Sequence, residues 1–263
     1  MPDVKAYFRS PNTVARWWRP ETSTYRHLYE RELALVRRDL RSSTPASLLD
    51  ISCGYGRLLV TLPADMRAIG LDISAEMLKL SRQNAPGRPL VCADAERLPF
   101  ADQSFASITC LMSLVHFPRP DRVIQEACRV LVPGGFLIAD IDNERSLGRA
   151  VKGIAKYVGS RSGVAMNSRG EGIFRTYTEE TFCRMLIAAG FVVQHVDHIG
   201  FFPSTSIAFS GRRERHFLPG ELSRLLSPLD GVLSRLPLAR RWTTYVYARA
   251  RKPENLREIG AAR

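Results

Sequence analysis

Short apolar runs alternate with amphipathic stretches along most of the chain, and the two patterns predict different secondary structures. The apolar runs are rich in aliphatic residues and have the length of buried strands. The stretches between them repeat apolar residues at the spacing of one helix face. We expect strands over residues 47–52, 67–71, 89–92, 105–111, 135–141, 191–199 and 241–249. We expect helices over residues 22–41, 56–62, 74–84, 120–131 and 178–188. This alternation predicts an α/β fold with a doubly wound parallel sheet.

Acidic and glycine residues gather where the first three predicted strands end. The first strand contains Asp50 and leads into a tight turn with Gly54 and Gly56. Because glycine has no Cβ, the backbone can turn sharply there and approach a ligand closely. The second strand ends at Asp72, about 20 residues on, and the third is followed by Asp94. The carboxyl ends of parallel strands form the ligand-binding edge of an open sheet, so the sequence predicts a nucleotide-cofactor site there.

These motifs resemble the S-adenosylmethionine (SAM) site of class I methyltransferases, and in particular the ubiquinone/menaquinone-biosynthesis subgroup. The matching segments are Asp50 to Gly56, Asp72, Asp94 to Phe100, Ile108 to Ser113, and Arg129 to Gly135. The resemblance covers residues 46–141 well and residues 176–191 more loosely. It implies a Rossmann-like, seven-stranded, mostly parallel sheet, with SAM as cofactor and S-adenosylhomocysteine (SAH) as product. Ser52 stands where the family usually has glycine, which implies a slightly wider turn.

The resemblance also implies a set of polar contacts to the cofactor. Asp72 is expected to accept hydrogen bonds from the ribose hydroxyls. Asp94 is expected at the adenine amino group, with the Ala95 amide beside it. Asp50 is expected to organise the glycine turn near the methionine amino end. Leu111 is expected to offer its backbone carbonyl to the sulfonium or amino side.

Apolar packing completes the expected cofactor site. Ile73 and Met77 are expected to pack on the adenine or the ribose. The full set of expected cofactor-binding residues is Asp50, Ser52, Cys53, Gly54, Gly56, Asp72, Ile73, Met77, Asp94, Ala95, Glu96 and Leu111.

His116, shortly after the fourth predicted strand, is the candidate catalytic residue. Methyl transfer is an in-line displacement that mainly requires alignment of donor and acceptor. An imidazole, with an unperturbed pKa of about 6.5, suits proton removal from a hydroxyl acceptor. The alternative is that His116 only orients the acceptor or packs. The sequence shows no His/Cys cluster and no recognisable triad of metal-binding carboxylates, so we expect no metal.

Composition places the chain among cytoplasmic globular proteins. It is 45% hydrophobic and 24% charged, no apolar run is long enough to span a bilayer, and the first residues lack the apolar stretch of a secretion signal. The five cysteines form no C-x-x-C pair, so we expect buried, reduced thiols. The formal net charge is +12, of which +3 lies in residues 1–141 and +9 in residues 142–263.

Part of this positive charge lies in an insertion after the fifth strand of the core. Arg145, Arg149, Lys152 and Lys156 recur on one face of a predicted helix. Such a helix either makes peripheral contact with an anionic membrane or phosphate groups, or is a solvated helix packed on the sheet.

A second insertion, residues 200–239, is rich in leucine at helical spacing, and Pro228 is expected to divide it into two short helices. It either packs in the core or lines an apolar acceptor pocket. The expected organisation is an N-terminal helical flap 1–45, a SAM-binding core 46–142, a basic cap insertion 143–175, a C-terminal half of the sheet 176–252 that includes the insertion 200–239, and a tail 253–263.

The leading functional hypothesis is a SAM-dependent methyltransferase acting on a small or lipid-like acceptor, with O-methylation slightly favoured. An RNA methyltransferase is the alternative that the net charge suggests, although nucleic acid is disfavoured because neither an Asp/Asn-Pro-Pro-aromatic motif nor a Pro-Cys nucleophile occurs. A non-catalytic SAM-binding protein is a third hypothesis. An NAD-dependent oxidoreductase is disfavoured by Leu59, where the dinucleotide fingerprint needs glycine. Oligomeric state is not readable from the sequence.

Overall fold

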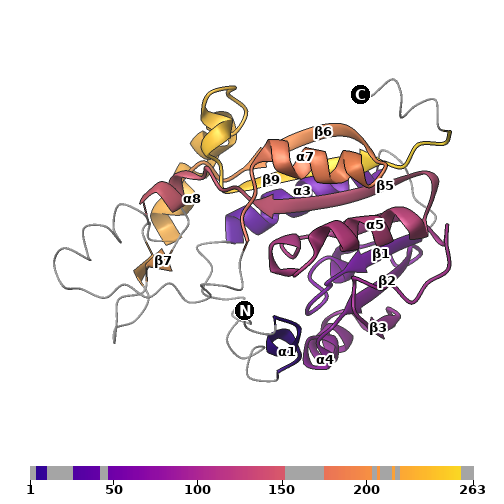
Figure 1. Cartoon of the computed structure of the whole chain (residues 1–263). Helices are drawn as coiled ribbons and strands as arrows, with labels where there is room; N and C mark the ends of the chain where they lie inside the picture. Colours follow the sequence, from indigo (N-terminus) through magenta and orange to yellow (C-terminus); the bar gives the residue numbers. More distant parts are fainter. Residues whose placement is uncertain are drawn as a thin grey trace.

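One seven-stranded sheet organises the chain. The computed structural model describes residues 4–10, 26–41, 47–151, 175–202, 206–207, 215–216 and 220–255. The strands are β1 (Ser47–Ile51), β2 (Arg67–Asp72), β3 (Leu90–Cys92), β4 (Phe105–Cys110), β5 (Leu131–Asp142), β6 (Val192–Ile199) and β9 (Tyr245–Arg251), and they pair in the order β3-β2-β1-β4-β5-β9-β6 (Figure 1). A separate short pair joins β7 (Ser206–Ile207) and β8 (Arg215–His216). The expected doubly wound, mostly parallel sheet is confirmed.

The strand directions put six carboxyl ends at one edge. β1 pairs in parallel with β2 and β4, β2 pairs with β3, and β4 pairs with β5. β9 runs antiparallel to both β5 and β6, with Asp142 opposite Tyr245. β6 is therefore parallel to β5, and its carboxyl end at Ile199 lies on the same edge as the ends of β1, β2 and β4.

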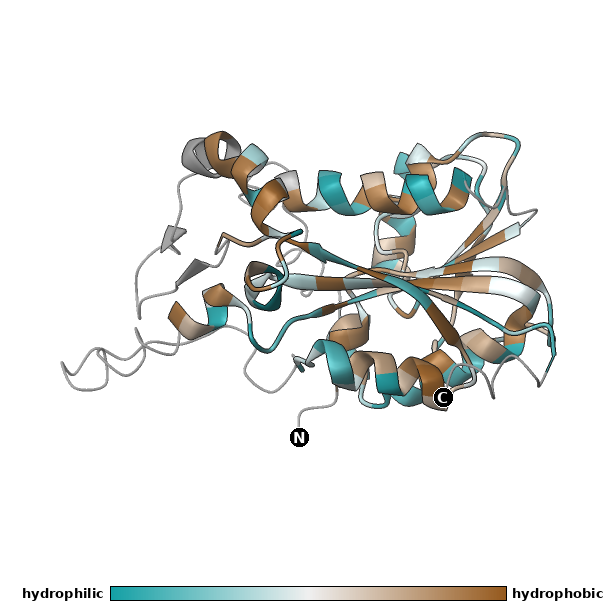
Figure 2. Cartoon of the chain, turned by 90° about the horizontal axis from the view of Figure 1, so that it is seen from above, coloured by the Kyte–Doolittle hydropathy of each residue, from teal (hydrophilic) through white to brown (hydrophobic). Residues whose placement is uncertain are grey.

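Helices cover both faces of the sheet, as the view in Figure 2 shows. The helices are α1 (Val4–Arg9), α3 (Arg26–Arg41), α4 (Ala75–Asn84), α5 (Pro120–Val130), α7 (Glu179–Ala188) and α8 (Gly220–Leu233), with short 3-10 helices η1 (Leu59–Thr61), η2 (Leu114–His116) and η3 (Ala239–Trp242). Val123 of α5 and Phe182 of α7 are buried in one core. Val36 of α3 and Leu78 of α4 are buried in the other, on the opposite face. The sheet is thus the middle layer of three.

Three expected elements differ from the structure. The helix expected over 56–62 is only the 3-10 turn η1, because Leu62 precedes Pro63 and adopts an extended conformation, which a residue before proline prefers. The strand expected at 135–141 begins earlier, at Leu131, and the last strand begins later, at Tyr245, because η3 occupies residues 239–242.

The leucine-rich insertion also differs from its prediction. Pro228 does not divide it, since α8 continues through the proline to Leu233. A proline removes one helical hydrogen bond, and the buried contacts of Asp230, two residues later, hold the helix in place beyond it. Leu225 and Leu229 are exposed, so the alternative that the leucines of this insertion pack in the core is wrong for these two positions.

Candidate active site

The turn after β1 has the backbone conformation that glycine favours. Ser52, Gly54 and Gly56 have φ angles of +56°, +54° and +82°. A Cβ added at Gly54 would meet nothing within 4 Å, whereas one at Gly56 would lie 2.6 Å from Oγ of Ser81. Gly56 therefore allows the turn to pack on α4, while Gly54 borders open space where a ligand can approach the backbone. Ser52 adopts a left-handed conformation without being glycine.

The carboxylate of Asp72 joins this turn to the start of α4. Its Oδ2 accepts the Gly54 amide at 2.9 Å, and its Oδ1 accepts the Ser74 amide at 2.9 Å. Ser74 in turn caps α4, since its side chain accepts a hydrogen bond from the Met77 amide. Burial raises the pKa of Asp72 above its ordinary value, and the two amide hydrogen bonds offset only part of this effect. A buried acceptor thus lies at the carboxyl end of β2.

Asp50 is fully buried one strand away. It accepts a hydrogen bond from Oγ1 of Thr109 at 2.7 Å. Burial raises its pKa to about 7, although the Thr109 hydroxyl and the nearby guanidinium of Arg57 both favour the charged form. The proximity of Asp50 to the glycine turn agrees with the expected organising role, which stays a prediction.

A buried ion pair under the turn was not predicted from the sequence. Arg57 lies 2.6 Å from Oε2 of Glu32 in α3, and its guanidinium stacks over the ring of Tyr29 at 4.8 Å.

Asp140 of β5 accepts the Met112 amide at 2.5 Å, and burial, together with the neighbouring Glu32, raises its pKa well above the ordinary value. The only signals in the sequence are Arg57 directly after the glycine turn and an aspartate inside an apolar run.

Lys5 of α1 lies between the two acidic residues that follow β3. Its Nζ is 2.6 Å from Oδ2 of Asp94 and 2.8 Å from Oε2 of Glu96. Glu96 also accepts Nη2 of Arg119 at 2.9 Å and the Arg119 amide at 3.1 Å. Burial is the largest single influence and opposes the charge on both carboxylates. The hydrogen bonds from Lys5 act together with the other hydrogen bonds and positive charges at each carboxylate, and their sum holds both pKa values below the ordinary range. Glu96, expected at the cofactor, links α1 to the start of α5.

His116 ends η2, just beyond the carboxyl end of β4. Its amide donates to the Ser113 carbonyl at 2.9 Å, and its ring lies 5.1 Å, centroid to centroid, from Phe8 of α1. Tyr7 packs edge-to-face on Phe8 at 5.2 Å. Through Lys5 and Phe8, the short helix α1 therefore covers the edge of the sheet where the expected site lies. Trp17, Trp18 and Tyr25, the other aromatic residues of the expected flap, lie outside the described residues.

The remaining expected cofactor residues lie around the same edge. Ile73 and Met77 are half-buried at the start of α4, while Cys53, Ala95 and Leu111 are buried. Burial raises the pKa of the Cys53 thiol above its ordinary value. Cys110 is also buried, but Cys92 is exposed, contrary to the expectation that the cysteines are buried.

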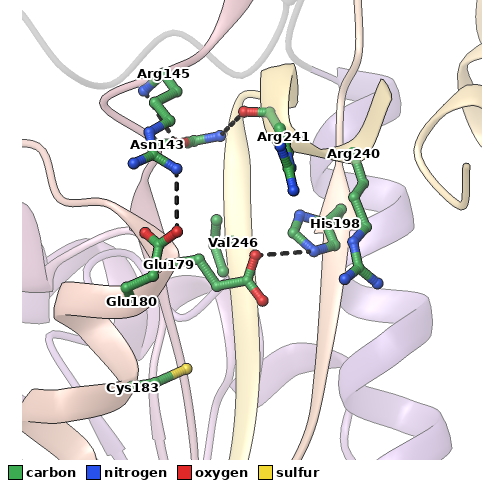
Figure 3. A pocket seen from close by; sticks show the side chains of 9 residues that line it. All are labelled: Asn143, Arg145, Glu179, Glu180, Cys183, His198, Arg240, Arg241 and Val246. Carbon is green, nitrogen blue, oxygen red and sulfur yellow. Dashed lines mark hydrogen bonds and ion pairs between the residues drawn. The ribbon is translucent and has the colours of Figure 1, made fainter. Parts of the chain in front are cut away.

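A separate cavity of about 320 Å³ lies beside α7 and the ends of β6 and β5 (Figure 3). It is lined by Asn143, Arg145, Glu179, Glu180, Cys183, His198, Arg240, Arg241 and Val246. Nε2 of His198 is 3.5 Å from Oε2 of Glu179, and Arg145 pairs with Glu180 at 3.0 Å. Burial lowers the pKa of His198, which Glu179 only partly offsets. None of the expected cofactor-binding residues lines this cavity.

In the described part of the chain, no helix has the length and apolar character needed to cross a membrane. Among the same residues, no group of three or more His, Cys, Asp or Glu side chains is arranged to hold a metal ion. Lys152 and Lys156 of the predicted basic helix lie outside the described residues, while Arg145 before them makes the ion pair with Glu180.

A comparison with family models gives a match over the core of the fold. Residues 49–139 match the family described as "methyltransferase domain". This segment of the chain is therefore similar to a methyltransferase domain. The match spans the glycine turn, Asp72, Asp94 and His116, and ends within β5.

Curated relatives of this domain transfer methyl groups to different atoms. A malonyl-[acyl-carrier protein] O-methyltransferase of Methylococcus capsulatus is 40% identical over 109 residues, which cover 39% of this chain and 40% of the relative. A ubiquinone/menaquinone biosynthesis C-methyltransferase of Bartonella tribocorum is 37% identical over 107 residues, which cover 36% of this chain and 41% of the relative. The chain thus spans about two fifths of the length of these relatives, and the quinone subgroup is not singled out among them.

The fold extends well beyond the matched segment. The magnesium protoporphyrin IX methyltransferase of Synechocystis PCC 6803, solved with bound SAH, superposes with a TM-score of 0.62 at 16% identity, covering 95% of this chain and 98% of that one. At this identity the likeness shows the fold. The expected class I methyltransferase fold is confirmed, and the domain match agrees with SAM as the expected cofactor.

Proposed function

We propose that this protein is a SAM-dependent methyltransferase that acts on a small or lipid-like acceptor, with transfer to oxygen favoured. The observation that carries the proposal is the arrangement of Gly54 and Asp72. Gly54 borders open space, and its amide is held at 2.9 Å by a buried carboxylate at the end of β2. Open backbone beside a carboxylate acceptor fits a ribose with two hydroxyl donors.

The chain's own residues would hold the cofactor along the carboxyl edge. Asp72 accepts hydrogen bonds from the ribose hydroxyls, and Asp94 accepts from the adenine amino group. Ile73 and Met77 pack on the adenosine, and the Leu111 carbonyl faces the sulfonium or amino end. Bound SAM supplies a methyl group activated by the positive sulfonium. The protein mainly aligns the methyl donor with the acceptor, which is the main requirement of an in-line displacement.

His116 acts in this proposal as the base for a hydroxyl acceptor. It lies at the end of η2, next to the carboxyl end of β4, and Phe8 covers one side of its ring at 5.1 Å. An apolar cover limits access of water to the reacting atoms. An acceptor that carries no proton to remove would use His116 only for orientation.

Binding of SAM is the first test. Calorimetric titration with SAM and with SAH is expected to give micromolar dissociation constants. Asp72→Ala is expected to weaken both by at least about tenfold, because two hydroxyl donors lose a charged acceptor. Asp65→Ala is the matched control, since Asp65 is an exposed aspartate outside the site. A wild-type protein that binds neither compound would contradict the proposal.

The acceptor class needs a second test. Transfer of labelled methyl from SAM is measured with malonyl thioesters, demethylated quinones, phenolic lipids and bulk tRNA as acceptors. Label in a small or lipid-like acceptor supports the proposal, and the identity of the methylated atom decides between oxygen and carbon. Label in tRNA alone would establish the RNA methyltransferase instead. SAM binding with no transfer to any of them would favour the non-catalytic alternative.

A further inference from the structure

In the described part of α8 and the turn after it, buried polar residues face the protein and several large apolar residues face the solvent. Asp230 and Ser234 are buried at 1% and 3% exposure, while Leu225, Leu229, Val232 and Leu236 are exposed at 77%, 48%, 56% and 47%. These four positions are spaced i, i+4, i+7 and i+11, so they form one stripe along the helix and the turn that follows it. This is the reverse of the usual orientation of an amphipathic helix on a soluble protein.

Polar contacts fix this orientation. Asp230 forms a buried ion pair with Arg31 of α3 and accepts the Phe202 amide at 3.0 Å. The hydroxyl of Ser234 donates to the Asp230 carbonyl at 2.7 Å. With these groups satisfied inside the protein, the leucine stripe is held outward.

The exposed apolar surface continues into the next turn. Leu238 and Trp242 are exposed at 78% and 48%. Exposed large apolar side chains that gather in one place mark an interaction surface rather than the scattered exposure common on soluble proteins. A half-exposed tryptophan is typical of a side chain at a boundary between polar and apolar surroundings.

The charges beside this apolar surface are of one sign. Arg235, Arg240 and Arg241 are exposed, and the last two also line the open cavity beside α7. Between residues 225 and 244, Asp230 is the only acidic residue in the sequence, and it is buried against Arg31. Exposed leucine, tryptophan and arginine within one short segment are the composition of segments that lie in the headgroup region of an anionic bilayer.

We propose that the α8–η3 surface, made of the exposed apolar stripe from Leu225 to Trp242 with Arg235, Arg240 and Arg241, docks this protein peripherally onto an anionic lipid bilayer. A second copy of the chain fits less well, because a two-fold interface brings the same patch of both copies together. The three arginines of each copy would then face like charges.

The α8–η3 surface lies next to the carboxyl edge of the sheet. Phe202, three residues after β6, joins α8 to the carboxyl edge of the sheet, and α8 lies beyond that edge in Figure 1. The glycine turn and His116 lie on the same edge. Docking through α8 therefore attaches the protein to the bilayer by an element that lies next to the ligand-binding edge of the sheet, whatever the acceptor is.

The test is co-sedimentation of the full chain with vesicles of phosphatidylcholine alone and with vesicles of equal parts phosphatidylcholine and phosphatidylglycerol. Binding to the anionic vesicles is expected, with little binding to the neutral ones. The double variant Leu229→Glu, Val232→Glu is expected to lower the partition coefficient at least about tenfold, and Arg235→Gln about fivefold. Ile187→Glu, at an exposed apolar position of α7, is the control and is expected to bind like the wild type.

Thermal unfolding of each variant establishes that it is folded. The proposal is overturned if the wild type does not prefer anionic vesicles, or if the folded double variant still binds them like the wild type. It is also overturned if sedimentation velocity without lipid shows a dimer that the double variant dissociates, because the stripe is then covered by a second copy. None of these readouts depends on methyl transfer, so a failure of the proposed function is distinguishable from a failure of the docking surface.

Discussion

The Gly54 amide donates a hydrogen bond to Oδ2 of Asp72 at 2.9 Å, across 18 residues of sequence. The other oxygen of the same carboxylate accepts the Ser74 amide. One buried side chain thereby connects the turn after β1, the end of β2 and the start of α4. The residue expected to bind the ribose is thus also a structural part of the turn, and the two roles need to be separated by experiment.

Asp72→Asn is expected to weaken SAM binding at least about tenfold and to lower the free energy of unfolding by about 1–2 kcal/mol. The amide keeps one acceptor oxygen but turns an N–H group toward a backbone donor, which leaves a buried group without its partner. Calorimetry with SAM and urea denaturation measure the two effects. Ser74→Ala is the control, because it removes the α4 cap at a cost of about 1 kcal/mol and leaves the carboxylate in place. If Ser74→Ala weakens SAM binding as much as Asp72→Asn does, Asp72 affects binding only through the structure of the turn.

Gly56→Ala is expected to cost at least about 1 kcal/mol more stability than Gly87→Ala. Both glycines have a φ angle of +82°, so the conformational penalty of a side chain is matched. Only at Gly56 does an added Cβ collide, at 2.6 Å from Oγ of Ser81. Urea denaturation of both variants gives the difference. Equal destabilisation would mean that α4 moves away from the turn without cost.

The pH dependence of stability is expected to change in Asp50→Asn. Burial raises the pKa of Asp50 to about 7 in the folded protein, whereas the ordinary value of an aspartate is about 3.9. Between these values the folded state holds a proton that the unfolded state has lost. The contribution of Asp50 to stability is therefore full below pH of about 4 and is lost as the pH rises toward 7.

Asparagine does not titrate, so the variant is expected to gain about 2–3 kcal/mol relative to the wild type between pH 5 and pH 8. Urea denaturation of both proteins at pH 5 and at pH 8 gives the stability difference between variant and wild type at each pH, and the change in that difference is the expected gain. The substitution also removes the interaction of Asp50 with Arg57. This loss lowers the stability of the variant equally at both pH values and therefore cancels in the comparison. A pH-independent difference would show that Asp50 stays charged throughout.

The sequence predicts those parts of the fold that depend on local pattern. The apolar runs locate the strands, and the spacing between Gly54 and Asp72 correctly brings both to the carboxyl edge. The contact of Arg57 with Glu32 depends instead on how α3 packs on the sheet, and no local signal encodes that packing. The same holds for Lys5 and Asp94, which are 89 residues apart. The orientation of α8 could not be predicted either, because leucine periodicity indicates an apolar face without telling whether that face is buried.

Lys5→Ala is expected to accelerate SAH dissociation about fivefold, which corresponds to on the order of 1 kcal/mol for partly exposed ion pairs. Lys5 connects α1 to Asp94 and Glu96, and α1 covers the site through Phe8. Stopped-flow displacement of SAH measures the rate. Lys79→Ala, which removes the exposed pair with Glu76, is the control and is expected to leave the rate unchanged. Slower dissociation in Lys5→Ala would mean that Lys5 competes with the cofactor for Asp94.

His116→Gln tests the proposed base once a hydroxyl acceptor is identified. Glutamine can still donate and accept hydrogen bonds but cannot take up a proton near neutral pH, so kcat/KM is expected to fall about 10²–10⁴-fold. The dissociation constant for SAH is expected to stay within about twofold, because His116 is not among the residues proposed to hold the cofactor.

The pH profile separates this role from packing. In the wild type, kcat/KM is expected to fall on the acidic side as the imidazole becomes protonated, and this limb is expected to vanish in His116→Gln. Phe8→Leu is the matched control, because it loosens the contact with the ring while leaving the imidazole able to titrate. A His116→Gln enzyme that keeps both its rate and its acidic limb would assign His116 to orientation, and the base would have to come from the acceptor or from solvent.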